Sequence, residues 1–296
     1  MPGVFSSSIS RKQFLKTGAL AAGAMLLRPQ ATQAESDDTS THLAILSDTH
    51  LPADEKNEYR GFRPTENLKT VLPQVIQAKP EGVIINGDAA RLTGEIDDYK
   101  ALHGILNPLA EKAPIYIGLG NHDHRGNFGK VFANQPDANA KVSNKQVLVI
   151  DYPAVRVVVL DSLLYVNKVA GLLGKTQRDW LTKFLETTEK RPTVFFVHHS
   201  LGDNDGDLLD ADRMFAIMEP HKHVKAVFYG HSHRWHFSKQ GHIHLINLPA
   251  VGYNFNDQQP VGWVDATFTK TGAELTLQAF GGNQEDHGKK HVLSWA

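Results

Sequence analysis

The stretch Ile115-Tyr116-Ile117-Gly118-Leu119-Gly120-Asn121-His122-Asp123 joins a short apolar run to three polar residues that can bind metal or act in catalysis. The run predicts a buried strand over residues 115–119, and Gly120 predicts a tight turn directly after it. A strand that is apolar on both faces is typical of the interior of a sheet covered on both sides. The polar residues therefore follow the carboxyl end of a central strand.

The same arrangement recurs four times elsewhere in the chain. Short apolar runs over residues 42–46, 82–85, 193–197 and 226–229 each end abruptly in polar or glycine residues. Because ligand sites of open α/β sheets form at the carboxyl ends of strands, we expect the side chains at these ends to converge. These side chains are Asp48, His50, Asp88, His198, His199, His231 and His233.

Helical patterns lie between the strands. Apolar residues gathered on one side predict helices over residues 65–78, 96–110, 176–188 and 210–218, with Thr65 as the N-cap of the first. Residues 146–150 and 156–160 predict a hairpin, and residues 243–248, 263–267 and 274–279 predict further strands. The fold class is therefore α/β, with either one mixed sheet or a second sheet packed on the first.

The donor atoms indicate a metal site. Carboxylate and amide oxygens combined with imidazole nitrogens suit Zn, Mn, Fe, Co or Ni better than Ca or Mg. Each short motif alone is weak evidence for a metal site, since a buried Asp often caps a turn. Five such motifs in order, each at the end of a strand, together predict one shared site. His198 and His199 would point to opposite faces of a strand, so only one is expected to be a ligand unless the strand has already ended.

Residues 43–249 resemble the calcineurin-like metallophosphoesterases in the motifs they contain and in the order of these motifs. The motifs are Asp-x-His, Gly-Asp, Gly-Asn-His-Asp, His-His and Gly-His-x-His. The resemblance implies a four-layer αββα sandwich with two mixed β-sheets and a dinuclear metal site at the carboxyl ends of the strands. It implies that Asp88 bridges two ions and that His122 faces the substrate. The implied ligands are Asp48, His50, Asp88 and His233 for one ion, and Asp88, Asn121, His198 and His231 for the other.

The resemblance also bears on the substrate. Residues 93–102 are similar to the stretch that follows Gly-Asp in class III cyclic-nucleotide phosphodiesterases and related glycerophosphodiesterases. Purple acid phosphatases have a tyrosine ligand where Arg91 stands here, so an iron–tyrosinate site is not expected. We therefore expect a small phosphoester substrate, foremost a phosphodiester, rather than a nucleic acid polymer, and two divalent ions drawn from Fe, Mn, Zn or Co.

The implied reaction is an in-line attack on phosphorus by a hydroxide that bridges the two metals. His122 would assist the leaving group or a phosphoryl oxygen, and Asp123 would either orient His122 or cap a surface turn. Two alternatives stay open: a phosphomonoesterase or nucleotidase of the same family, and a non-catalytic exported metal-binding protein. Arg60 and Arg125 are expected at the surface, with a phosphate contact as the alternative, and Tyr253 is expected to pack, with stacking on a base as the alternative.

The composition excludes several other classes of site. The chain of 296 residues contains no cysteine, which rules out disulfides, thiolate nucleophiles and Cys-type zinc sites. Its formal net charge is −1, so no excess of basic residues indicates nucleic acid or an anionic membrane as a partner.

The N-terminal residues resemble an export signal. Residues 10–16 are similar to a twin-arginine (Tat) signal with Lys12 in place of the second arginine, residues 17–27 are apolar, and residues 31–34 offer small residues for cleavage. The apolar run is shorter than the roughly 20 residues that span a bilayer. We expect a signal over residues 1–34, a linker over 35–41, and one metallophosphoesterase domain over 42–296. The mature protein would be periplasmic or extracellular and would be exported by the twin-arginine route. It would have no integral membrane segment.

Overall fold

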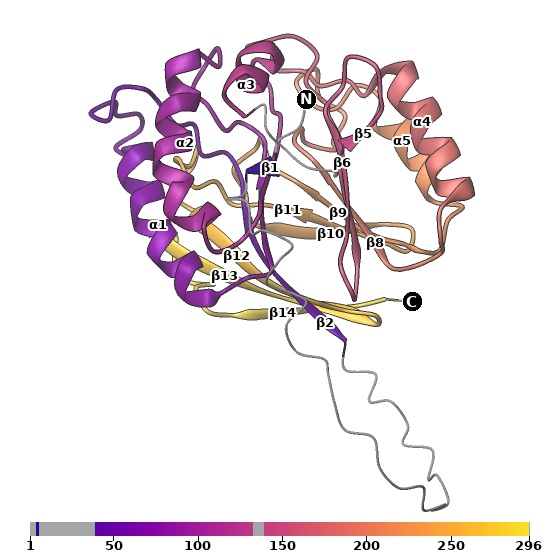
Figure 1. The fold of residues 1–296 in the computed structure, drawn as a ribbon. Coiled ribbons are helices and arrows are strands. Elements are labelled where there is room, and N and C mark those ends of the chain that lie inside the picture. Colours follow the sequence, from indigo (N-terminus) through magenta and orange to yellow (C-terminus); the bar gives the residue numbers. More distant parts are fainter. Residues whose placement is uncertain (1–3, 6–38, 133–138, 296) are drawn as a thin grey trace, which may run out of the picture.

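The computed structural model describes residues 4–5, 39–132 and 139–295, which form two β-sheets packed face to face with helices on both outer surfaces (Figure 1). Each sheet contains seven strands and mixes parallel with antiparallel neighbours. This is the four-layer αββα architecture that the motifs imply, and it confirms a second sheet rather than a single mixed one.

The first sheet has a parallel half and an antiparallel half. Strands β2 (Ser40–Leu46), β3 (Gly82–Asn86) and β4 (Ile115–Gly118) are parallel, and the short β1 (Val4–Phe5) pairs antiparallel with β4. On the other side of β2 the sheet continues through three antiparallel strands. They are β12 (Pro260–Thr269), β13 (Gly272–Gly282) and β14 (Lys290–Ser294).

The second sheet has four parallel strands at its centre. They are β7 (Arg156–Val159), β8 (Thr193–Val197), β9 (Val224–Tyr229) and β11 (Ile243–Asn247). Antiparallel strands close both sides: β6 (Val147–Asp151) and β5 (Asn139–Ala140) beyond β7, and β10 (His236–Gln240) beyond β11. The predicted hairpin is thus β6–β7, and β5 lies outside it at the edge of this sheet.

Five helices are described. The first sheet is covered by α1 (Pro64–Ala78), α2 (Ile96–Ala110) and α3 (Arg125–Val131), and the second by α4 (Gly174–Thr187) and α5 (Ala211–Met218) (Figure 1). Four of them match predicted helices to within two residues at each end. Thr65 is not the N-cap of α1; Arg63 is, and Pro64 begins the helix because its missing N–H would be unpaired in the first turn anyway.

The strands divide their side chains between three apolar layers. In β8, Val194 and Phe196 point into the layer between the sheets, whereas Phe195 and Val197 point toward α4 and α5. This alternation explains why the central strands are apolar without interruption. Phe196 and Phe228 stack at the centre, with ring centroids 4.7 Å apart and planes 8° from parallel.

Five described elements have no counterpart in the prediction, namely the two-residue strands β1 and β5 together with β10, β14 and α3. The side chains of β10 are half-buried or exposed, and Leu293 is the one buried side chain of β14, so no apolar run marks these edge strands. The seven-residue α3 buries only Phe128, which is too little for an amphipathic pattern.

The predicted export signal lies outside the described residues except for β1, and β2 begins at Ser40, so it takes in the last two residues of the predicted linker. Among the helices of the described residues, none is long and apolar enough to cross a membrane.

The packing of the two sheets predicts a large loss of stability on truncation of Phe228. Removing this fully buried ring leaves a cavity beside Phe196, so Phe228→Ala should lower the free energy of unfolding by about 3–5 kcal/mol. Urea denaturation followed by circular dichroism measures the change. Val292→Ala, on a side chain that is 72% exposed, should change it by less than about 0.5 kcal/mol. A loss below about 1 kcal/mol for Phe228→Ala would contradict this account of the core.

Candidate metal centre

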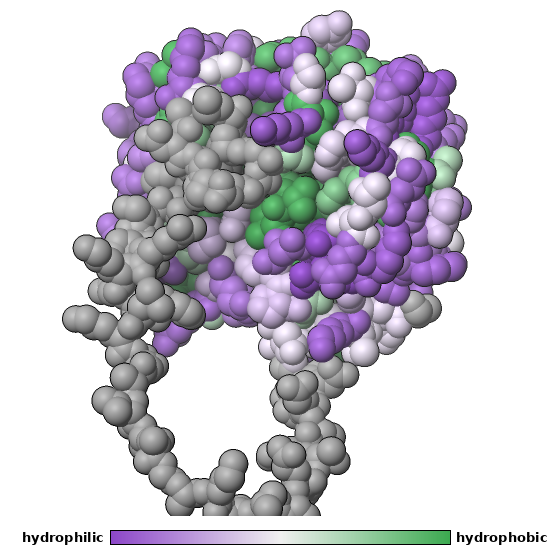
Figure 2. Space-filling model, turned by 45° about the vertical axis from the view of Figure 1, so that its right-hand side comes forward, coloured by the Kyte–Doolittle hydropathy of each residue, from purple (hydrophilic) through white to green (hydrophobic). Residues whose placement is uncertain are grey.

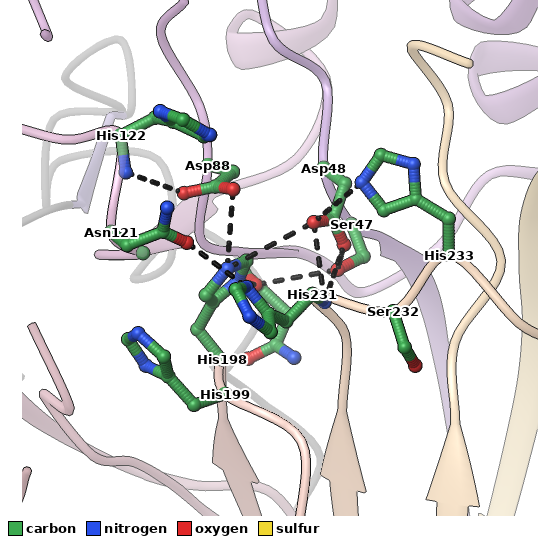
Figure 3. Close-up of polar contacts among 12 residues, drawn as sticks. Ser47, Asp48, Asp88, Asn121, His122, His198, His199, His231, Ser232 and His233 are labelled. Carbon is green, nitrogen blue, oxygen red and sulfur yellow. Dashed lines mark hydrogen bonds and ion pairs between the residues drawn. The ribbon is translucent and has the colours of Figure 1, made fainter. Parts of the chain in front are cut away.

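The predicted ligands lie directly after the strands that were expected to carry them. Asp48 and His50 follow β2, and the amino acids after β3 and β4 include Asp88 and Asn121. On the second sheet, His198 follows β8, and the pair His231 and His233 follows β9. The side chains meet in one group. Figure 3 shows all of these ligands except His50.

Five of these residues adopt a left-handed backbone conformation that side chains other than glycine rarely take. Their φ angles are 52° for Asp48, 45° for His50, 45° for Asp88, 68° for His231 and 51° for His233. Such conformations cost on the order of 1 kcal/mol or more each, so the surrounding structure must hold them. Hydrogen bonds between the loops do so: Asp48 N donates to Gly87 O (3.1 Å) and His50 N donates to Asp88 O (2.8 Å).

One cluster contains Asp48, His50 and His233, all buried. His233 Nε2 lies 3.2 Å from Asp48 Oδ1 and 3.1 Å from His50 Nε2. Two atoms that each lie about 2.1 Å from one tetrahedral or octahedral ion are roughly 3.0–3.4 Å apart. The observed spacing is therefore that of ligand atoms around a single ion.

A second cluster contains Asp88, His198 and His231, with Asn121 beside it. His198 Nε2 lies 3.3 Å from Asp88 Oδ2, and His231 Nδ1 lies 3.0 Å from Asn121 Oδ1. These distances again fall in the range expected around one ion. The same Asp88 Oδ2 is 3.7 Å from His50 Nε2 of the first cluster, so the Asp88 carboxylate lies between the two groups.

Backbone carbonyls orient two of the imidazoles. Asn86 O lies 2.9 Å from His198 Nδ1, and Tyr253 O lies 2.6 Å from His233 Nδ1. A carbonyl can only accept, so both Nδ1 atoms carry a proton, and Nε2 is the atom of each ring that can bind a metal. His198 Nε2 is buried and has no hydrogen-bond partner, as expected of a metal-binding nitrogen. The residues present thus fit two divalent ions.

The charges of the centre also favour the binding of metal cations. Burial alone would lower the pKa of the His198 imidazole, but the carboxylates of Asp88 and Asp48 outweigh burial and raise it to about 10. Burial would raise the pKa of Asp48, and the nearby His233 and His198 overcome it and hold that pKa below its ordinary value. Both carboxylates are therefore ionised in a buried site, where a metal cation would neutralise them and displace the His198 proton.

His122 lies at the mouth of the centre, half-buried. Its backbone N donates to Asp88 Oδ1 (2.8 Å), and its Nδ1 donates to Leu92 O (2.8 Å). The Leu92 carbonyl thus fixes the tautomer of the ring and leaves Nε2 for other partners. One ring nitrogen of His122 shares a group with His50 and Asp88, so the ring is within reach of a substrate bound to the metals.

The structure corrects both suggestions for Asp123. This residue is fully buried, so it is not a surface cap, and its carboxylate does not orient the His122 ring. It accepts hydrogen bonds from the Tyr99 hydroxyl (2.9 Å) and from the backbone N–H groups of three residues. These are Ala89 (3.2 Å), Ala90 (3.1 Å) and Gly120 (2.9 Å). Asp123 therefore ties together the loops that carry Asp88 and Asn121.

His199 follows the strand end, as His198 does, and its ring lies beside those of His198 (5.1 Å) and His231 (5.0 Å), but it belongs to neither ligand cluster. Its Nδ1 lies 2.7 Å from Ser162 Oγ, and the side chain is buried. Figure 3 shows it to the side of the ligands, away from Asp48 and Asp88. Of the adjacent histidines, His198 is the one placed in a ligand cluster.

Neither candidate phosphate-binding arginine points at the clusters. Arg125 makes a two-pronged ion pair with the fully buried Asp161 (2.6 and 2.8 Å), which Lys145 also approaches. Arg60 donates to Phe255 O (3.2 Å) at the exposed rim. The Asp161 pair orders the loop after β7, whose Asn167 N donates to Asn121 O (2.6 Å).

The supporting contacts that Tyr99, Asn86 and Tyr253 make at the site were not predicted from the sequence. The Tyr99 hydroxyl donates to Asp123 and accepts from His124 N (2.8 Å), although its apolar helical position indicated only core packing. Asn86 and Tyr253 act through backbone carbonyls, which carry no signature in side-chain type.

Comparison with known proteins agrees with this geometry. The family model described as calcineurin-like phosphoesterase matches residues 41–235. A 3′,5′-cyclic adenosine monophosphate phosphodiesterase from Pseudomonas aeruginosa is 26% identical over 227 residues, covering 74% of this chain and 79% of that protein. A 3′,5′-cyclic-nucleotide phosphodiesterase from a Nostoc species is 26% identical over 229 residues, covering 73% and 80%.

The fold also matches solved structures. A dimetal phosphatase from Danio rerio superposes with a TM-score of 0.67 at 12% identity, covering 86% of this chain and 99% of that one. At this identity the likeness concerns the fold alone. The matched family model spans about two thirds of the sequence and includes every strand end that bears a candidate ligand. The chain therefore belongs to the calcineurin-like phosphoesterase family and is a metal-dependent hydrolase of phosphoric esters.

Proposed function

We propose that the chain is a phosphodiesterase that hydrolyses cyclic nucleotides with two divalent ions. The observation that carries the proposal is the double cluster of ligands around Asp88, with His122 at its mouth. The relatives from Pseudomonas aeruginosa and Nostoc, which carry the names of cyclic-nucleotide phosphodiesterases, support this choice of substrate.

The seven ligands would divide between two ions. Asp48, His50 and His233 would hold one ion and Asn121, His198 and His231 the other, with Asp88 shared. When bound, the two ions would supply an activated hydroxide and clamp the phosphoryl oxygens of an in-line displacement. Fe, Mn, Zn and Co all suit these donors.

The charge of the centre favours an anionic substrate. Two divalent ions more than offset the two carboxylates of Asp48 and Asp88, and the histidine ligands would be neutral once they bind metal. A positive centre in a buried site attracts the single negative charge of a phosphodiester. A dianionic monoester would bind more tightly if a further cation contacted its phosphate. Arg125 is not free for this contact because it is paired with Asp161. The charge balance therefore favours a diester over a monoester or nucleotidase substrate.

His122 would protonate the leaving oxygen. Its Nδ1 proton is held by Leu92 O, so a second proton on Nε2 can be given to an oxygen at the mouth of the site. A sugar alkoxide is a poor leaving group and needs that proton, whereas p-nitrophenolate leaves without it.

Loss of a ligand should abolish activity while the fold is retained. Asn121→Ala and His231→Ala should each lower kcat/KM for bis-p-nitrophenyl phosphate by about 100-fold or more, because the second ion loses a bond. EDTA should abolish turnover, and Mn²⁺ or Zn²⁺ should restore it. His221→Ala, at the opposite end of β9, is the matched control and should keep full activity. Full activity of Asn121→Ala, or activity in EDTA, would contradict the scheme.

The role of His122 predicts a dependence on the leaving group. His122→Ala should lower kcat for 3′,5′-cyclic AMP by about 10²–10⁴-fold but kcat for bis-p-nitrophenyl phosphate by less than about tenfold. Steady-state kinetics with both substrates measures the difference. Equal losses with the two substrates would show that His122 does not act as the general acid.

We also propose that the protein is exported through its N-terminal segment. The basic, apolar and small-residue order of residues 1–34 supports this. Cleavage there would remove β1, the two-residue edge strand that pairs with β4. Sequencing of protein purified from the periplasm should find a mature N-terminus near residue 35. An intact Met1 on protein recovered from the cytoplasm alone would contradict export.

A further inference from the structure

Three aromatic residues from two separate loops line one side of the ligand cluster; Tyr59, Tyr253 and Phe255 are here called the aromatic rim. The Tyr253 ring stacks on His50, with centroids 4.7 Å apart and planes at 28°. The Phe255 ring stacks on His233, at 4.3 Å and 24°. Tyr59 meets the Tyr253 ring edge-on, at 4.8 Å. The rim is therefore continuous with the candidate metal centre.

The outer part of the rim is open to solvent. Tyr59 is 42% exposed and Phe255 is 46% exposed, whereas Tyr253 is buried beneath them. Within the described part of the chain, seven large apolar side chains are exposed, and all but Val292 lie in loops at the end of the sandwich that carries the ligands. They are Tyr59, Leu92, Tyr165, Val169, Leu209, Phe255 and Val292. Figure 2 shows hydrophilic side chains over much of the face in view and a hydrophobic patch near its centre. Exposed apolar groups gathered at a catalytic end indicate a ligand with an apolar part.

The exposed ring faces already accept a flat, delocalised group. The Arg60 guanidinium lies over the Phe255 ring at 5.3 Å and over the Tyr59 ring at 5.7 Å. Arg91 lies over Tyr59 at 5.9 Å. A nucleobase is likewise planar with a π-face, and it can stack on an aromatic ring or on a guanidinium plane. Saturated groups such as glycerol have no such face.

The aromatic rim is also connected to the residues that position His122. Leu92, which holds His122 through its carbonyl, follows Arg91, and Arg91 lies over the rim residue Tyr59. Because the rings stack directly on the ligand histidines, a base on the rim would bring the phosphate that its sugar carries to the metals. His122 would then lie beside the leaving oxygen of the same nucleotide.

We propose that the aromatic rim binds the base of a nucleoside phosphodiester, so that Tyr59 and Phe255 determine the specificity of the enzyme for nucleotides. The proposal rests on the proposed phosphodiesterase function and adds the part of the substrate that is recognised away from phosphorus. Tyr59 and Phe255 act on binding, and neither takes part in the chemical step.

The test compares 3′,5′-cyclic AMP with the corresponding ribose cyclic phosphate that carries hydrogen in place of the base. The double variant Tyr59→Ala, Phe255→Ala should raise KM for cyclic AMP by about 10–100-fold with kcat nearly unchanged, because stacking is lost. KM for the base-free compound should change by less than twofold. Tyr59→Phe and Phe255→Tyr keep the rings and should retain the KM of the wild type.

Tyr165→Ala is the matched control, because Tyr165 is an aromatic residue that is more accessible still (71% exposed) and lies in a different loop at the same end. It should leave both KM values unchanged. The role of the rim would be overturned if the double variant raised KM equally for the two compounds, or if it did not raise KM for cyclic AMP. Either result would leave the proposed phosphodiesterase activity intact. A wild-type enzyme that cleaves neither compound nor any other phosphodiester would instead overturn the proposed function, and the rim assignment with it.

Discussion

The Asp88 carboxylate lies between two groups of ligand atoms, and the rest of the centre is built to hold it there. One oxygen faces His198 Nε2 and His50 Nε2, and the other accepts from the backbone of His122. The residue has a left-handed backbone, which must be stabilised from outside. Asp123 stabilises it by accepting hydrogen bonds from the backbone N–H groups of the two residues that follow Asp88. The hydroxyl of Tyr99 on α2 donates a hydrogen bond to Asp123 in turn. Hydrogen bonds therefore connect the helix α2, through Asp123, to the backbone of the loop that carries Asp88.

The two sheets contribute different donor atoms. The oxygen ligands Asp48, Asp88 and Asn121 come from the ends of β2, β3 and β4 in the first sheet, together with His50. The second sheet contributes only imidazoles, from the ends of β8 and β9. Each ligand group combines residues of both sheets, except the one that includes His122. The distance between the sheets, which Phe228 of the second sheet helps to set through its ring contact with Phe268 of the first, is therefore also a determinant of the metal geometry.

Much of this arrangement could be predicted from the sequence because the central strands are buried on both faces. Such strands are uninterrupted apolar runs, and the ligands come directly after them, so both the parallel strands and the converging residues were identifiable. Edge strands such as β10 bury little and leave no pattern. The supporting contacts were equally hidden: the carbonyls of Asn86 and Tyr253 orient ligand rings whatever their side chains, and the link from Tyr99 to Asp123 joins residues in different elements.

The shared role of Asp88 is the central claim, and anomalous X-ray diffraction from crystals of the purified protein tests it most directly. Data collected at the absorption edge of the bound metal should show two peaks roughly 3.5–4 Å apart, each within bonding distance of one Asp88 oxygen. One peak would lie among Asp48, His50 and His233, and the other among Asn121, His198 and His231. A single peak, or two peaks of which one does not contact Asp88, would contradict the account.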